Sequence, residues 1–398
     1  MSPSRPRERF TFHGNVSESR HGWLRLTPAY SVHLVRELLE KHAQPGRAVL
    51  DPFCGTGTTM LTCAEAGIDC LTVDVNPFLV WLAKAKTAHY SPKVISEFQT
   101  LIRNMGRGAD SPPQTRRWTP SLHKIERWWD EATLRALAAA FHKLTTSSAS
   151  PRAKDLARLA FCRALIRSSK ASFGHQSMSF KEQTGVLPRV SAELQQAAER
   201  LNRSCQQPMR PSKRHARLGD ARALDAVKSN LPIGVLITSP PYANRMSYVR
   251  ELRPYMYWLG YLRDGREAGE LDWRAIGGTW GIATSRLNEW QPSGRRMPRG
   301  LSRSLRRIHD ESPVLANYVA RYFDDMQAHL ASAFPRIAPG GSVHYVVGNS
   351  KFFDEVVAVE QLLATQLKSA GFRRVSVTQL RKRTSKRELY EYLVSAEK

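Results

Sequence analysis

Apolar residues follow two different spacings in the N-terminal part of this chain, and together the spacings predict alternating strands and helices. Residues 47–51 and 68–74 are short, mainly apolar stretches that each end on an aspartate, as expected of buried strands. Helical spacing follows each stretch, over residues 59–66 and 77–86. A succession of strand, helix, strand and helix predicts a parallel sheet.

A long basic segment of helix-forming composition comes next, before strand signals return. Residues 91–214 are rich in Arg and Lys and predict a helical insertion with breaks near residues 110–113 and 147–151. Three later stretches predict further strands, at residues 235–238, 342–347 and 375–378. Because strand signals lie at both ends of the chain, we expect one α/β sheet to be assembled from both ends.

Two other segments predict irregular structure. Residues 286–307 carry seven Arg among Pro, Gly and Ser, which predicts a mobile loop. Residues 339–341 are Pro-Gly-Gly and predict a turn that leads into the strand at residues 342–347.

The charge balance indicates the kind of partner. The chain has 398 residues, with 60 Lys plus Arg against 35 Asp plus Glu, and a formal net charge of +25. This length allows one large elaborated domain or two, with enough apolar residues for a core. Such an excess of positive charge predicts a polyanionic partner, with nucleic acid first and an acidic membrane surface as the rival.

Membrane insertion and metal binding are not expected from the composition. No stretch approaches the roughly 18 continuous apolar residues of a membrane helix, and the Arg-rich start lacks the apolar segment of a signal peptide. We therefore expect a cytoplasmic protein. The five Cys form no C-x-x-C pair, which predicts reduced thiols and no metal site.

The first candidate site is the turn that follows residues 47–51. Gly55 and Gly57 stand between the predicted strand and helix, where glycine lets the backbone approach a ligand closely. Asp74 follows Asp51 by 23 residues, roughly where nucleotide-binding sheets place a carboxylate on ribose hydroxyls. The Gly-Lys-Ser/Thr of a phosphate-binding loop and the third glycine of the dinucleotide fingerprint are missing. The pattern predicts an adenosine-bearing cofactor, with an ordinary turn as the alternative.

The second candidate site is the Thr-Ser-Pro-Pro-Tyr sequence at residues 238–242. Two prolines fix the backbone φ angle and lack an N–H group. The Ser239 hydroxyl and the Pro240 carbonyl can accept two hydrogen bonds from one amino group, and Tyr242 offers a ring face for a planar base. These features predict a pocket for a flipped base, whereas a Pro-Pro strand end with a core tyrosine is the alternative.

With both motifs in this order, the chain resembles S-adenosylmethionine-dependent amino-methyltransferases of DNA, and among them the cytosine-N4 branch. Residues 51–57 resemble the cofactor loop of that family, residues 73–77 its ribose-binding strand end, residues 218–221 its adenine-contacting segment and residues 238–242 its catalytic motif. Further matches lie at residues 21–30, 34–39, 248–249, 258–260, 276–278, 322–326, 339–341 and 347–350.

The resemblance implies a doubly wound, Rossmann-like α/β sheet of the class I methyltransferase type with about seven strands. It also implies S-adenosylmethionine as cofactor and a set of site residues. Those expected to bind the cofactor are Tyr30, Asp51, Phe53, Gly55, Gly57, Thr58, Asp74, Asn76 and Asp220. Those expected to act in catalysis are Ser239, Pro240, Pro241 and Tyr242. It also divides the chain into methyltransferase parts at residues 1–91, 214–260 and 316–398, a helical basic insertion at 92–213 and a basic loop insertion at 261–315.

The implied activity is methylation of the exocyclic N4 amine of a flipped cytosine in double-stranded DNA, in restriction-modification or phage defence. A cognate restriction endonuclease is then a candidate partner, and the oligomeric state is open. C5-cytosine chemistry is disfavoured because no Cys follows a Pro. Three alternatives stay open: adenine-N6 methylation, since related adenine enzymes carry Asp, Asn or Ser at the position of Ser239, RNA base methylation, and a DNA-binding module on a degenerate methyltransferase fold.

Extruding a base requires a basic surface that grips the nucleic-acid backbone. The candidates are Arg103, Arg107, Arg116, Arg117, Lys124 and Arg127, interleaved with Trp118, Trp128 and Trp129, together with residues 286–307. For each Arg a solvated surface charge is the alternative, and for each Trp a place in the core. Only residues 222–237 separate Asp220 from Thr238, so target reading is expected from residues 92–213 and 261–315 or from another subunit.

Overall fold

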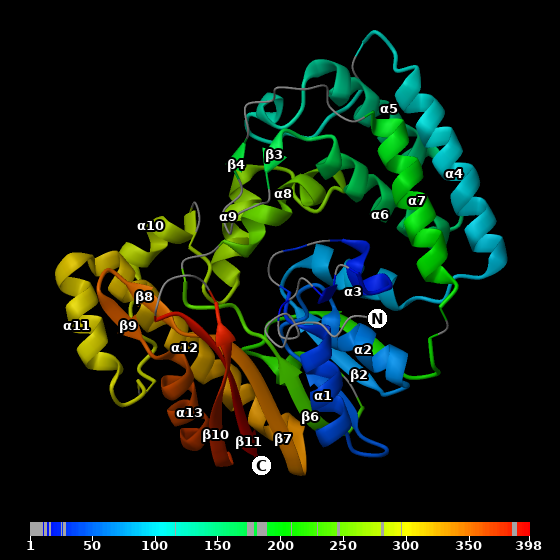
Figure 1. Ribbon diagram of the computed structural model, residues 1–398. Coiled ribbons are helices and arrows are strands. Elements are labelled where there is room, and N and C mark those ends of the chain that lie inside the picture. The colour runs from blue at the N-terminus through cyan, green and yellow to red at the C-terminus, as the bar shows by residue number, and fades with distance from the viewer. Residues whose placement is uncertain are drawn as a thin grey trace.

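A mostly parallel sheet forms the centre of the computed structural model (Figure 1). The structure describes residues 11, 14–15, 17–24, 26, 29–115, 117–172, 179–180, 189–207, 209–228, 230–244, 247–279, 282–295, 297–383 and 388–398. Within them, the main sheet has seven strands in the order β10-β11-β7-β6-β1-β2-β5. Their bounds are β1 Ala48–Asp51, β2 Cys70–Asp74, β5 Arg214–Leu218, β6 Ile233–Thr238, β7 Ile337–Gly348, β10 Arg373–Lys382 and β11 Tyr390–Glu397.

Strand directions define one edge of the sheet as the place for a site. Strands β5, β2, β1, β6 and β7 pair in parallel, whereas β11 is antiparallel to both β7 and β10. The chain order reverses between β1 and β6, and ligands of open α/β sheets bind at such a switch point beyond the carboxyl ends of the strands. The prediction of a doubly wound α/β sheet of seven strands is confirmed.

Two helical layers cover the sheet, because successive strand residues point to opposite faces. On one face lie α1 Val32–His42, α2 Thr58–Ala66 and α3 Pro77–Thr87, and on the other lie α12 Pro313–Arg336 and α13 Val359–Ser369. Val235 packs toward the first layer and Leu236 toward the second. Every residue of β6 is buried, as expected of a central parallel strand.

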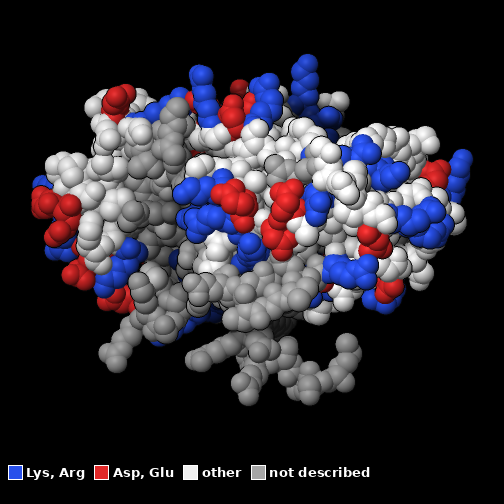
Figure 2. All heavy atoms as spheres, turned by 90° about the horizontal axis from the view of Figure 1, so that it is seen from above, with Lys and Arg blue, Asp and Glu red and all other residues white. Residues whose placement is uncertain are grey.

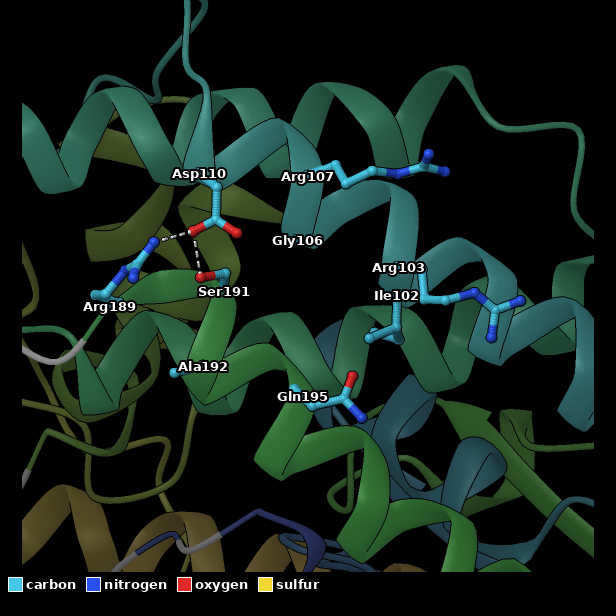
Figure 3. Close-up of a pocket in the computed structure, with 9 residues that line it drawn as sticks. All are labelled: Ile102, Arg103, Gly106, Arg107, Asp110, Arg189, Ser191, Ala192 and Gln195. Atoms are coloured by element: carbon cyan, nitrogen blue, oxygen red, sulfur yellow. Dashed lines mark hydrogen bonds and ion pairs between the residues drawn. The ribbon is translucent and has the colours of Figure 1, made fainter.

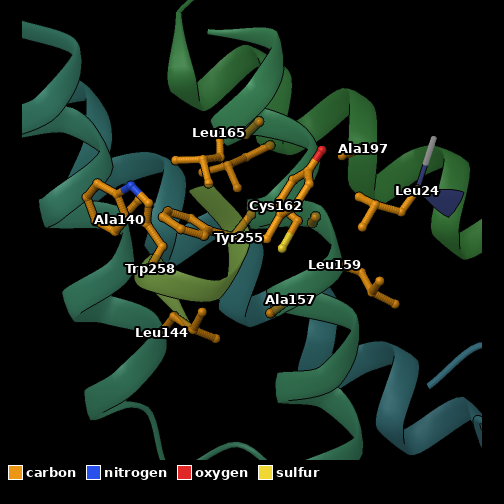
Figure 4. Packing of buried hydrophobic residues seen from close by; sticks show 14 of the residues in the cluster. Leu24, Ala140, Leu144, Ala157, Leu159, Cys162, Leu165, Ala197, Tyr255 and Trp258 are labelled. Atoms are coloured by element: carbon orange, nitrogen blue, oxygen red, sulfur yellow. The ribbon is translucent and has the colours of Figure 1, made fainter. Parts of the chain in front are cut away.

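The predicted helical insertion forms a separate cluster of four long helices that shares a core with α3 and with α8 Tyr248–Trp258 (Figure 1). They are α4 Pro92–Asp110, α5 Glu131–Thr146, α6 Pro151–Arg167 and α7 Val190–Cys205, with a short hairpin of β3 Ala171–Ser172 and β4 Ser179–Phe180. Ser150 caps α6 through the N–H of Ala153, with Pro151 in the first turn, so the predicted break at 147–151 is a helix start. Figure 4 shows Trp258 of α8 packed among side chains such as Leu144 and Leu165.

Of two predictions of irregular structure, one is wrong in part and the other is wrong. The two ends of the segment 286–307 are helical, in α10 Ile282–Glu289 and α11 Leu301–Glu311, whereas residues 290–295 and 297–300 between them lie outside helices. The apolar residues Leu301, Leu305 and Ile308 recur at helical spacing and pack toward α12, a pattern masked by the surrounding Arg, Pro and Gly. Arg296 lies outside the described residues.

The Pro-Gly-Gly sequence at 339–341 lies inside β7 and is not a turn before it. Gly340 has φ of 72°, and a Cβ atom on Gly341 would lie 2.6 Å from the Gly234 carbonyl oxygen of β6. Glycine is therefore required for the close pairing of β7 with β6.

The remaining described elements are short. They are the helix α9 Gly265–Arg274, the strands β8 Ser350–Phe352 and β9 Glu355–Val357, and the 3₁₀ helices η2 Arg20–Trp23, η3 Ile125–Arg127 and η4 Leu224–Ala226. None of the helices in the described part of the chain is long and apolar enough to cross a membrane.

Candidate active site

Asp51 ends β1 and connects the two predicted motifs. Its side chain is fully buried, and its Oδ1 accepts hydrogen bonds from the Thr238 hydroxyl at 2.6 Å and from the Phe53 N–H at 3.1 Å. Burial raises the pKa of Asp51 to about 6, against the opposing hydrogen bond from Thr238. Its Oδ2 makes no hydrogen bond within the described residues. The motif at the end of β1 is thus joined directly to the motif at the end of β6.

The glycine turn between β1 and α2 is fixed by backbone contacts. The Cys54 N–H donates to the Val73 carbonyl of β2 at 2.9 Å, and the Gly57 N–H donates to the Cys54 carbonyl at 2.8 Å. Gly57 has φ of 76°, and a Cβ atom there would lie 3.0 Å from the Cβ of Ala83 in α3. Only glycine combines this backbone with such close helix packing. Thr58 begins α2 and is buried.

Asp74 at the end of β2 faces the same turn. Its Oδ2 accepts the Gly55 N–H and its Oδ1 accepts the Asn76 N–H, both at 2.9 Å. Burial raises the pKa of Asp74 to about 7, although these hydrogen bonds favour the ionised form. Asn76 caps α3, since its side-chain oxygen accepts the Phe78 N–H at 3.0 Å. The Asn76 side-chain oxygen is therefore used within the protein, at the start of α3.

Asp220 lies beside Asp74, because the Gly219 N–H donates to the Asp74 carbonyl at 3.0 Å. The Arg222 guanidinium donates to both carboxylate oxygens of Asp220, at 3.0 and 2.6 Å, and to Oδ1 of Asp325 at 2.7 Å. Burial favours the neutral acid, but hydrogen bonds from Arg222 outweigh it and lower the pKa of Asp220. Much of the hydrogen-bonding capacity of Asp220 is thus used by Arg222.

Phe53 packs against His329, a buried histidine whose place in the site was not predicted from the sequence. The Phe53 and His329 rings pack edge to face with centroids 4.9 Å apart. The His329 ring nitrogens lie 2.8 Å from the Ala221 carbonyl and 2.9 Å from the Tyr345 hydroxyl. Burial lowers the pKa of His329 to about 4, so the ring is neutral near pH 7.

Tyr30 and Lys86 connect the N-terminal segment to the glycine turn and to α2. The Tyr30 hydroxyl is hydrogen-bonded to the Thr59 hydroxyl in the first turn of α2. The buried Lys86 ammonium donates to the Thr56 carbonyl at 2.9 Å and to the His21 carbonyl at 3.3 Å. Burial lowers the pKa of Lys86 to about 8. Lys86 is one of two lysines in an apolar helical stretch, and no sequence pattern indicated these contacts.

The second motif continues from β6 at the same edge. Ser239 is half-buried, and its hydroxyl donates to the Val346 carbonyl of β7 at 3.1 Å. Pro240 is buried and Pro241 is half-buried. The Tyr242 N–H donates to the Tyr248 hydroxyl at 2.8 Å, and the Tyr242 hydroxyl donates to Glu391 at 2.6 Å.

The basic candidates in the insertion fall into different environments. Arg103 and Arg107 are exposed on α4 and line an open groove of about 620 Å³ between α4 and α7, together with Arg189. Figure 3 shows the Arg103 and Arg107 side chains extending from α4, while Arg189 is paired with Asp110 at 2.8 Å. The groove therefore carries more positive than negative charge.

The remaining candidates are exposed or belong to the core. Arg117, Lys124 and Arg127 are exposed, and Figure 2 shows Lys and Arg distributed over the upper face of the molecule. Trp118 is 58% exposed, whereas Trp128 and Trp129 are buried among the insertion helices and are not surface stacking residues. Arg116 lies outside the described residues.

Comparison with known proteins agrees with the architecture. A family model described as DNA methylase, for N6 and N4 methyltransferases, matches residues 9–85. The Type II methyltransferase M.BsoBI of Geobacillus stearothermophilus is 23% identical over 95% of this chain and 83% of its own length. The Type II methyltransferase M.MjaII of Methanocaldococcus jannaschii is 39% identical over 18% of this chain and 13% of its own length.

Among solved structures, the rRNA methyltransferase aviRa from Streptomyces viridochromogenes aligns with 97% of this chain and 96% of its own, at 13% identity and a TM-score of 0.31. The strand order, with its single antiparallel strand between β7 and β10, is that of a class I methyltransferase. These comparisons support an amino-methyltransferase of the N4/N6 family, with S-adenosylmethionine as its cofactor.

Proposed function

We propose that this protein methylates the exocyclic N4 amine of a flipped cytosine in DNA. The observation that carries the proposal is the hydrogen bond from the Ser239 hydroxyl to the Val346 carbonyl. Because the hydroxyl proton is used in this bond, the lone pairs of Ser239 Oγ are left to accept an N–H from a substrate amine. Ser239 Oγ is therefore available to accept a hydrogen bond from the amine, as activation of that amine requires.

The neighbouring residues suit the same task. The Pro240 carbonyl is a second acceptor. Because Pro240 and Pro241 lack an N–H group, neither can donate a hydrogen bond to it. Two acceptors on one amino group would localise its lone pair on nitrogen and hold the amine in a fixed orientation. The Tyr242 ring would stack on the base and align its plane. No covalent bond between the protein and the base is needed.

The residues around Asp74 fit an adenosine-bearing cofactor. Each Asp74 oxygen accepts one backbone N–H and keeps a lone pair for a ribose hydroxyl, and Oδ2 of Asp51 has no protein partner within the described residues. The ring of Phe53 and the backbone beside Asp220 would contact the adenine. S-adenosylmethionine supplies an electrophilic methyl group when bound. Asp51 and its partner Thr238 would set the distance between the cofactor side and Ser239.

DNA is the substrate favoured by charge and by the relatives. The net charge of +25 favours a polyanionic partner, and the two relatives are both Type II methyltransferases by name. We assign phosphate contacts to Arg103 and Arg107 in the α4/α7 groove within the insertion of residues 92–213. As a Type II modification enzyme, the protein would act beside a cognate restriction endonuclease.

Product analysis tests the proposal. Purified protein is incubated with S-adenosylmethionine carrying a deuterated methyl group and with unmethylated plasmid DNA, and the nucleosides are identified by mass spectrometry. We expect labelled N4-methylcytosine from the wild type, a strongly reduced amount from Ser239→Ala, and a wild-type amount from Ser369→Ala. Ser369 is exposed on α13 and serves as the matched control.

The other outcomes separate the alternatives. Labelled N6-methyladenine would overturn the cytosine assignment and keep the family. A label found only in RNA offered in parallel would overturn the DNA assignment. Absence of label in every nucleic acid, from a protein that binds the cofactor, would contradict the proposed function altogether.

A further inference from the structure

The last strand of the sheet contributes a residue to the second motif. Because β11 runs antiparallel to β7, its first residues lie at the carboxyl edge, with Glu391 opposite Gly348. Glu391 is 6% exposed, and its Oε1 accepts the Tyr242 hydroxyl at 2.6 Å. Its Oε2 accepts the Nε–H of Arg381 at 2.7 Å. A buried carboxylate is thus paired on one side and bound to Tyr242 on the other.

Arg383, at the end of the same hairpin, covers the Tyr242 ring. Its guanidinium carbon lies 4.8 Å from the ring centroid, within the range of a cation–π contact. One of its nitrogens donates to the Asn349 carbonyl at 2.9 Å, which fixes the guanidinium in this place. Arg383 therefore covers one face of the Tyr242 ring, so a base that stacks on this ring would use the opposite face.

Gly348 makes room for this arrangement. A Cβ atom at Gly348 would lie 2.5 Å from a guanidinium nitrogen of Arg383 and 3.0 Å from Cδ2 of Tyr242. No side chain larger than hydrogen fits without moving one of the two. The backbone N–H of Tyr242 donates to the Tyr248 hydroxyl, so the backbone of Tyr242 is restrained as well as its ring.

We propose that Glu391 and Arg383 are positioning residues that hold the Tyr242 ring in the orientation against which the target base stacks. This inference rests on the proposed function, since a base must enter beside Tyr242. Neither residue needs to contact the base, because each acts on the hydroxyl or on the covered face of the ring. Burial, followed by the negative charge of Glu391, raises the pKa of Tyr242 well above its usual value, so the hydroxyl stays protonated and able to donate.

Enzyme kinetics on plasmid DNA provide the first test. Loss of the ring orientation in Glu391→Ala should lower kcat on the order of 10- to 100-fold, as expected of a small misplacement near the reacting atoms, with the Kd for S-adenosylmethionine unchanged. Glu391→Gln keeps an acceptor oxygen and should recover part of the loss. Arg383→Lys keeps the charge but not the planar contact, and should be impaired like Arg383→Ala.

A double variant isolates the role of the hydroxyl. If Glu391 acts through Tyr242, the combination of Tyr242→Phe with Glu391→Ala should be no slower than the slower single variant. Independent, multiplying losses in kcat would overturn the positioning role. Glu397→Ala is the matched control on β11, because Glu397 pairs with Arg374 at 2.8 Å on the exposed end of the strand.

A measurement independent of activity separates this inference from the proposed function. With 3-fluorotyrosine placed at position 242, fluorine NMR should give one narrow line in the parent protein and a shifted or broadened line in Glu391→Gln and Arg383→Ala. An unchanged line in both variants would overturn the inference, even in a fully active enzyme. A changed line in a protein that methylates no nucleic acid would support the restraint on the ring and contradict only the proposed function.

Discussion

The two halves of the proposed site are built in different ways. On the cofactor side, Asp51, Gly55 and Asp74 lie within one short stretch and are connected by hydrogen bonds to the backbone of that same stretch. On the base side, Ser239 and Tyr242 depend on Val346 and Glu391, which follow more than one hundred residues later. The first half is a local turn, whereas the second exists only once the sheet has formed.

This difference predicts how substitutions will act. A local turn held by its own backbone keeps its shape when distant side chains change, so its variants should alter cofactor affinity alone. The base side relies on the Val346 carbonyl of β7 and on side chains of β10 and β11, three strands that lie side by side in the sheet (Figure 1), so it should respond to changes far away in sequence. The hydrogen bond from the Thr238 hydroxyl to Asp51 joins the two halves.

Ser239→Ala is expected to produce the largest effect. Removing the acceptor for the amine should lower turnover by roughly 100- to 1,000-fold, by analogy with loss of one stabilising group at a transition state. The Kd for S-adenosylmethionine, measured by calorimetry, should stay at the wild-type value. Cofactor binding lost with turnover retained would reverse the roles of the two halves.

Asp74→Ala should come second and act on the other half. Loss of hydrogen bonds to a charged group costs about 1.5 to 3 kcal/mol, or roughly 10- to 100-fold in the Kd for S-adenosylmethionine. The rate at saturating cofactor should change little. Calorimetry and methylation at several cofactor concentrations measure both quantities, and an unchanged Kd would show that Asp74 does not bind the cofactor.

The pH dependence of cofactor affinity should be smaller and specific to Asp74. The pKa of this carboxyl is raised to about 7, and ribose hydroxyls donate best to its ionised form. Affinity should therefore be full above that pKa and fall as the pH decreases through about 7, by at most about tenfold per unit. Asp74→Asn should bind weakly at every pH with a flatter profile. A profile in Asp74→Asn as steep as in the wild type would assign the titration to another group.

The α4/α7 groove lies outside both halves and should give the smallest effect. Replacing Arg103 and Arg107 with Glu should weaken DNA binding and lower the slope of log affinity against log salt by about 1 for each phosphate that the variant no longer neutralises. The Kd for S-adenosylmethionine should not change. Fluorescence anisotropy with labelled duplex across a salt series measures the slope, and Arg374→Ala is the control. An unchanged slope in the double variant would remove this groove from the DNA-binding surface.

Much of the fold could be predicted because its central strands are contiguous apolar runs. The strand predictions at 47–51 and 235–238 match β1 and β6 closely, and the helix prediction at 77–86 matches α3. β11 was missed because its polar residues, such as Glu391 and Ser395, hide its alternation. Helix α11, at the end of the segment 286–307, was mistaken for part of a loop because frequent Arg, Pro and Gly masked the helical spacing of three apolar residues.

The site could be predicted only where a motif is local. Spacing alone placed Asp74 beside the glycine turn, and the structure brings both together. Lys86, Glu391 and Arg383 could not be found, because their roles arise from contacts between residues distant in sequence. In the sequence, Lys86 and Glu391 are ordinary charged residues, and only the folded structure places them beside the two motifs.

One measurement tests most directly whether Asp74 acts in cofactor binding and Ser239 in turnover. It is single-turnover methylation by Asp74→Ala and Ser239→Ala at increasing concentrations of S-adenosylmethionine. The account predicts that the rate of Asp74→Ala rises toward the wild-type rate as the cofactor saturates, while the rate of Ser239→Ala stays low at every concentration. A Ser239→Ala rate restored by cofactor, or an Asp74→Ala rate that saturates far below the wild type, would contradict it.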